Sequence, residues 1–110
     1  MIIDPVVFES LKATMGEDFV GELVDIYFSE TADLIEKLKI AMEEEDANSF
    51  RRAAHSIKSS SASMGALEFS AQARSLEEIG KSGELKRAEG ELIEFINTYP
   101  GVVLALKELV

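Results

Sequence analysis

The sequence of 110 residues contains no cysteine, no tryptophan and only one histidine, His55. Without cysteine the chain can form neither a disulfide nor a thiolate metal site, which fits a reducing compartment and disfavours a zinc site. No apolar run approaches the roughly 20 residues that a membrane-spanning helix needs. Met1–Ile3 lead directly into Asp4–Pro5 and not into a basic, then apolar, signal segment. We therefore expect a cytoplasmic protein that does not associate with a membrane.

Positive charge is scarce, because 11 Lys and Arg residues face 21 Asp and Glu residues for a formal net charge of −10. Nucleic-acid binding rests on clustered basic side chains that release counterions, so a nucleic-acid partner is disfavoured. Acidic residues are in turn missing from Ala47 to Leu67, a stretch that contains Arg51, Arg52 and Lys58. A local basic patch on an acidic body suits an acidic partner or a phosphate. The simpler interpretation is a solvated helix face.

Period-two alternation is not sustained anywhere in the sequence, whereas helical periodicity is common. One long series with a spacing near 3.6 comprises Phe19, Leu23, Ile26, Tyr27, Ala32, Leu34, Leu38 and Met42. Asp4 followed by Pro5 is a helix start, and Tyr99–Pro100–Gly101 interrupts the last apolar pattern. These signals predict helices over Pro5–Ala13, Asp18–Glu44, Ala47–Ala62, Ala66–Lys81, Leu85–Asn97 and Val102–Val110.

The predicted helices favour an all-α fold, an antiparallel four-helix bundle with a short additional N-terminal helix. A hydrophobic content of 46% in a chain of this length suggests one core, so we expect a single domain over residues 1–110. Gly80 and Gly83 are predicted to end the fourth helix. Nothing in the pattern demands more than a monomer.

His55 is predicted to lie on the outward face of its helix, at about 100° per residue. The inner face would comprise Phe50, Ala54, Ile57 and Ser61. The outer face would comprise His55 together with Arg51, Ser59 and Ala62. Lys58 follows one turn later, so its ammonium group can reach a group that is bound to the imidazole or approaches it. His55 is therefore the candidate functional residue, and the simpler alternative is an exposed histidine beside a lysine.

The stretch HSIKSSSASMGA, which begins at His55, resembles the H-x-x-K-G-x-x-x-x-x-G signature of histidine-containing phosphotransfer (HPt) domains. The matching residues are His55, Lys58 and Gly65. Ser59 stands where the family usually has glycine, at a position that lets the backbone of a partner approach the histidine. Because serine is small, we expect docking to be kept. The chain length and the helices on either side of the motif are also similar to those of stand-alone HPt domains.

This resemblance implies a histidine phosphocarrier in a two-component phosphorelay. His55 would accept a phosphoryl group from the aspartyl phosphate of a receiver domain and pass it to another receiver, while Lys58 would offset the phosphoryl charge. Response-regulator receiver domains would be the partners, with a hybrid histidine kinase as a further candidate. The docking surface would comprise Arg51, Arg52, Ser59 and Ala62.

The resemblance also implies that the protein is a phosphotransfer intermediate and not an enzyme. The sequence has no phosphate-binding glycine loop, so we expect it neither to bind ATP nor to phosphorylate itself. We expect no cofactor either, because the Mg²⁺ ion of the reaction would belong to the receiver.

Glu77 is the third candidate site residue, because HPt domains often carry Gln or Glu at this spacing from the histidine. If two antiparallel helices turn near Met64, Ala73 is level with His55, and Glu77 lies one turn beyond it, within reach of a long side chain. A carboxylate that accepts a hydrogen bond from Nδ1–H would leave Nε2 free as the nucleophile. The alternative is an exposed glutamate in the acidic pair Glu77–Glu78.

Two other functions are compatible with the same residues. The chain could be a helical adaptor that binds a partner through the His55 face without phosphorylation. It could also be the phosphotransfer domain of a chemotaxis-type histidine kinase, in which a separate ATP-binding domain phosphorylates the histidine. A Ser-His-acid hydrolase is disfavoured, because the nearby serines lie on the same predicted helix as His55 and nothing orients them as nucleophiles.

Overall fold

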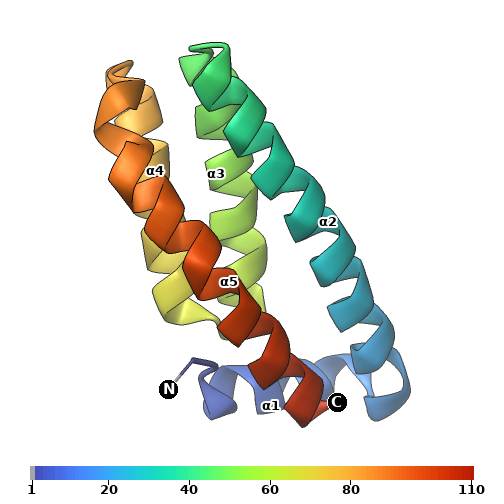
Figure 1. Cartoon of the computed structure of the whole chain (residues 1–110). Coiled ribbons are helices and arrows are strands. Elements are labelled where there is room, and N and C mark those ends of the chain that lie inside the picture. The colour runs from blue at the N-terminus through green and yellow to red at the C-terminus, as the bar shows by residue number, and fades with distance from the viewer. Residues whose placement is uncertain (1) are drawn as a thin grey trace.

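The computed structural model describes residues 2–110, which form helices and contain no strand. The elements are α1 (Pro5–Met15), α2 (Glu17–Glu43), α3 (Ala47–Ser63), α4 (Leu67–Ser82), the short 3-10 helix η1 (Leu85–Ala88) and α5 (Glu89–Leu109). Helices α2 to α5 run antiparallel in a four-helix bundle, and α1 lies across the end of the bundle that holds the C-terminus (Figure 1). The predicted all-α bundle with a short additional N-terminal helix is confirmed.

The α1 helix is capped and anchored by the residues at its start. Asp4 Oδ1 accepts hydrogen bonds from the amides of Val6 at 2.8 Å and Val7 at 3.3 Å, as predicted for an Asp-Pro helix start. The Asp4 amide donates to the Gly65 carbonyl at 2.8 Å, which ties α1 to the α3–α4 turn. Gly65 has a φ of +85°, and a Cβ at this position would lie 3.0 Å from the Asp4 carbonyl oxygen. The glycine of the motif therefore has a structural role in this turn.

The α2 helix buries a series of residues that shares only Tyr27 and Leu38 with the one that predicted it. Its buried residues are Val20, Val24, Tyr27, Thr31, Ile35, Leu38 and Ala41. Phe19 and Ile26, which belong to the predicting series, are instead 61% and 53% exposed. Both series have helical spacing, so the helix was predicted correctly although its inner face was only partly identified.

The α5 helix corrects the prediction of two separate C-terminal helices. The segment begins with η1 and then continues as one helix through Pro100 to Leu109. Pro100 is exposed, while Phe95 and Val102 on either side of it are buried. The Phe95 ring stacks on that of Phe69 in α4, with centroids 4.2 Å apart. Packing of this inner face outweighs the hydrogen bond that proline cannot donate.

The α3 helix lies between α2 and α4 and places its predicted inner face in the core. Its buried residues are Phe50, Ala53, Ala54, Ile57 and Ser61. The Ser61 hydroxyl is satisfied in the core by a 2.7 Å hydrogen bond with the Tyr27 hydroxyl of α2. Asp46 caps the helix by accepting from the Ser49 amide at 3.1 Å. This packing fixes which side of α3 faces solvent.

The end of α4 differs from the prediction at Gly80. Gly83, with a φ of +79°, is the residue that ends the helix. Gly80 lies inside α4 and is buried. None of the helices in residues 2–110 combines the length and the apolar character needed to span a bilayer.

Candidate functional site

His55 lies on the exposed side of α3, and 56% of its side-chain surface is accessible. Its neighbours Ala54 and Ile57 are fully buried, so their burial turns the imidazole outward. Ser59 and Ala62, which follow on the same side of the helix, are exposed as well. The predicted outward face is present, and its small side chains leave the histidine open to an approaching partner.

Glu77 of α4 lies directly against the imidazole. The distance between His55 Nδ1 and Glu77 Oε2 is 2.7 Å, which is the contact expected from the spacing of the two residues. Glu77 is only 3% exposed, unlike its neighbour Glu78 on the solvent side of α4. An ionised carboxylate can only accept, so Nδ1 carries the proton and donates it to Glu77. In the neutral ring, the lone pair of Nε2 is then free.

Lys58 also binds Glu77, through the second carboxylate oxygen. Its Nζ donates to Glu77 Oε1 at 2.7 Å, and 29% of the lysine side chain is exposed. One buried carboxylate thus joins the two candidate site residues that α3 presents. Sequence reasoning placed Lys58 beside the imidazole but missed its bond to Glu77, which depends on the packing of α4 against α3.

The environment of Glu77 favours its ionised form. Burial raises the pKa of this carboxyl, but the hydrogen bonds from Lys58 and His55 and their charges outweigh burial and leave the pKa below its usual value. Glu77 is therefore a carboxylate at neutral pH. It can hold the Nδ1 proton and stabilise positive charge that develops on the ring.

The predicted docking residues differ in their exposure and in their contacts. Arg51 is partly buried and donates from Nη2 to Asn48 Oδ1 at 3.1 Å, whereas Arg52 is exposed. Ser59 and Ala62 line a hollow between α3 and α4, of about 610 Å³, which also contains Lys58 and Glu77. The site therefore continues from the histidine into the groove between these two helices.

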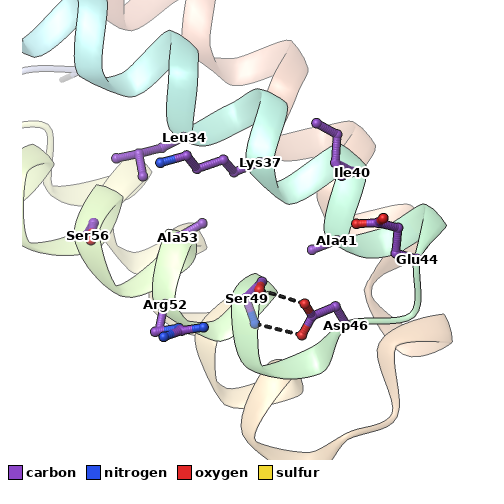
Figure 2. A pocket seen from close by; sticks show the side chains of 10 residues that line it. All are labelled: Leu34, Lys37, Ile40, Ala41, Glu44, Asp46, Ser49, Arg52, Ala53 and Ser56. Atoms are coloured by element: carbon purple, nitrogen blue, oxygen red, sulfur yellow. Dashed lines mark hydrogen bonds between the residues drawn. The ribbon is translucent and has the colours of Figure 1, made fainter.

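A second groove, of about 450 Å³, lies on the other side of α3, against α2 (Figure 2). Ser49, Arg52, Ala53 and Ser56 line it from α3; the remaining lining residues are Leu34, Lys37, Ile40, Ala41, Glu44 and Asp46. Ile40 is half exposed although it is apolar. Sequence reasoning missed this groove, and the exposed Ile40 could be recognised only once the inner face of α2 was known.

No three His, Cys, Asp or Glu side chains among residues 2–110 are grouped so that they could hold a metal ion. The polar groups around His55 are instead arranged for nucleophilic chemistry. The imidazole is accessible, its Nδ1 atom contacts a carboxylate, and a primary ammonium binds the same carboxylate.

Comparison with known proteins gives a family and a structural relative. A model of the Hpt domain matches residues 22–109. The crystal structure of histidine-containing phosphotransfer protein B from Pseudomonas aeruginosa is similar to this chain, with a TM-score of 0.92 and 30% sequence identity. The match covers 97% of this chain and 92% of the relative. No curated protein sequence matches.

Proposed function

Since the chain belongs to the Hpt domain family and is a histidine phosphocarrier of a phosphorelay, we propose that His55 is the residue that carries its phosphoryl group. The observation that supports this most directly is the 2.7 Å contact between His55 Nδ1 and buried Glu77, on a ring that is otherwise accessible. His55 is also the sole histidine of the sequence, and it matches the histidine of the family signature.

In the proposed reaction, the Nε2 lone pair of His55 attacks the phosphorus of an aspartyl phosphate on a receiver domain. The N–P bond forms, the O–P bond breaks, and the aspartate leaves as a carboxylate. The ring acquires positive charge while Nδ1 keeps its proton. Glu77 accepts that proton's hydrogen bond, so its negative charge stabilises the ring as charge develops. The reverse reaction passes the group to a second receiver.

Lys58 would offset the charge of the phosphoryl group. Its ammonium lies on the carboxylate that also binds the ring, so a small side-chain movement brings it to a phosphoryl group on Nε2. In this proposal the lysine acts through electrostatics, and the Mg²⁺ ion belongs to the receiver. The chain supplies neither an ATP site nor kinase activity, and it works in the cytoplasm.

The receiver would dock over the outward side of α3. Ser59 and Ala62 offer little steric bulk next to His55, while Arg51 and Arg52 supply positive charge. The groove between α2 and α3 extends this surface with the apolar side chains of Leu34 and Ile40 (Figure 2). Response regulators and a hybrid histidine kinase, whose receivers would all use this surface, are the proposed partners, and the chain would bind them as a monomer.

The proposal is tested by incubating the protein with a panel of phosphorylated receiver domains. The wild type should acquire phosphate that is labile in acid and stable in base. His55→Gln should acquire none, because no second histidine can substitute, while its helical circular dichroism should match the wild type. Labelling of His55→Gln at the wild-type rate would exclude His55 as the acceptor.

The same panel separates the two alternative functions. A helical adaptor would bind receivers without becoming labelled. The phosphotransfer domain of a chemotaxis-type kinase would become labelled efficiently only from ATP and a separate ATP-binding domain.

A further inference from the structure

A hydrogen bond between helices is made by Ser70 of α4. Its hydroxyl donates to the backbone carbonyl of Lys58 in α3 at 2.7 Å, and the residue is 8% exposed. Serines inside helices often bond a carbonyl of their own helix one turn earlier, as Ser60 and Ser63 do in α3. Ser70 instead reaches across to the helix that carries the histidine.

A second close contact joins the same two helices at Gly80. A Cβ on Gly80 would lie 3.0 Å from both Cα and Cβ of Arg51, so the two backbones approach more closely than a larger residue would allow. Arg51 precedes His55 by about one turn, and Lys58 follows it by about one turn. On α4, Glu77 likewise lies between Ser70 and Gly80.

The two contacts therefore flank the His55–Glu77 pair on both sides. We infer that Ser70 is a positioning residue: its bond to Lys58, together with the approach of Gly80 to Arg51, holds α4 in the register at which Glu77 reaches both His55 and Lys58. Both contacts of Glu77 are 2.7 Å long. A shift of about 1 Å along the helices would weaken one of them or take it out of hydrogen-bond range.

This inference rests on the proposed role of His55, but its first measurement is independent of phosphoryl transfer. The nitrogen NMR shifts of the ring report which tautomer is present, and no other histidine overlaps with His55. In Ser70→Ala, measured where the ring is neutral, the two shifts should move towards those of a tautomer mixture. Phosphorylation by phosphoramidate, a small donor that needs no docked partner, should slow about three- to tenfold, because one hydrogen bond changes an equilibrium by roughly that factor.

Two variants separate positioning from general stability. Ser75→Ala is the matched control, since Ser75 lies on the same helix but donates to Glu91 of α5 at the surface. It should keep the wild-type shifts and rate. Ser70→Thr keeps a hydroxyl and should restore most of both. All spectra are compared well below the unfolding temperature of each variant.

The inference is overturned if Ser70→Ala retains the wild-type ring shifts, or if Ser70→Thr is as impaired as Ser70→Ala, because packing and not the hydroxyl would then be responsible. Gly80→Ala provides a second perturbation of the same register from the other side, and it should move the ring shifts in the same direction. If wild-type His55 is not phosphorylated, the proposed function is contradicted. The role of Ser70 is still decided by the ring nitrogen shifts, which do not depend on phosphorylation.

Discussion

Glu77 connects the two candidate site residues of α3, His55 and Lys58, through a single buried carboxylate. Its Oε2 accepts a hydrogen bond from His55 and its Oε1 accepts one from Lys58, so each carboxylate oxygen has a partner on α3. The carboxylate fixes the protonated nitrogen of the ring and keeps the ammonium group within reach of it. Exchange of Lys58 between Glu77 and a phosphoryl group would link the state of the histidine to the position of the lysine.

Lys58→Ala should slow phosphoryl transfer, or shorten the lifetime of the phosphohistidine, by about tenfold, because a charge-assisted contact is lost. Lys58→Arg should be milder, since it keeps the charge. Lys81→Ala is the matched control, because Lys81 lines the same groove without contacting Glu77. Equal phosphoryl-transfer rates and phosphohistidine lifetimes for Lys58→Ala and Lys81→Ala would show that Lys58 contributes no more than any other surface charge.

The pH dependence of stability should reveal the ion pair of Glu77. Its pKa is lower in the folded protein than the ordinary value of 4.5, so the stabilisation that it provides is present above that pH and is lost as the pH falls through the folded pKa. Glu77→Gln should lower the free energy of unfolding at neutral pH by about 1 to 3 kcal/mol. The deficit should shrink as the pH falls below about 4.5.

Urea unfolding at a series of pH values measures this deficit directly. Other carboxylates with lowered pKa, such as Asp46, contribute equally to both proteins and cancel in the difference. Glu78→Gln is the control, because Glu78 is exposed and forms a surface ion pair with Arg74, at 3.7 Å. A deficit for Glu77→Gln that does not change with pH would contradict the assigned pKa direction.

At the scale of the elements, the sequence predicted the helical type of the segments better than their exact faces and ends. Helix α3 was predicted with the correct inner face, because its two large apolar residues, Phe50 and Ile57, lie on the same side of the helix. The α2 helix has two apolar rows, and the distinction between them depends on which row meets α3. The continuity of α5 could not be predicted either. It depends on packing between Phe95 and Phe69 of α4, two residues that lie far apart in the sequence.

Pro100→Ala should stabilise the protein, because α5 passes through this position without interruption. Alanine restores the amide that proline lacks and removes the clash of the ring with the preceding turn, so we expect a gain of about 1 to 3 kcal/mol. Asn97→Ala, at another exposed position of α5, should gain only about 0.7 kcal/mol or less from helix propensity. Thermal or urea unfolding measures both gains. If Pro100→Ala stabilises the protein no more than Asn97→Ala does, then α5 accommodates the proline without a cost in stability.

In the candidate site, the arrangement of residues within one helix could be predicted from the sequence, whereas most contacts between helices could not. His55 and Lys58 share one helix, so their arrangement follows from helical geometry and could be predicted. The contact of Glu77 with His55 was anticipated from an assumed α3–α4 turn together with the family pattern. The bond from Ser70 and the groove beside α2 depend on the packing of separate helices, and no spacing within the sequence predicts them.

For the whole molecule, the uneven charge distribution defines where an acidic partner can approach. The net charge is −10, yet no acidic residue occurs from Ala47 to Leu67, and Lys37 of α2 adds to the positive charge beside α3. A receiver that carries an acidic phosphorylation site would be repelled by most of the surface and attracted by this part of it. Electrostatic steering of this kind acts mainly on the association rate.

Arg52→Glu should therefore slow phosphoryl transfer from a receiver by about tenfold at low salt, through slower association. The difference from wild type should diminish as salt is raised, because the screening length is only about 8 Å at physiological ionic strength. Lys107→Glu changes the net charge equally but lies in the last turn of α5, at the end of the bundle crossed by α1 (Figure 1). It should leave the rate nearly unchanged.

Phosphorylation of His55 by phosphoramidate should be the same in all three proteins, since it needs no docked receiver. Equal slowing of receiver transfer by Arg52→Glu and Lys107→Glu would show that net charge, and not the surface around His55, controls the encounter.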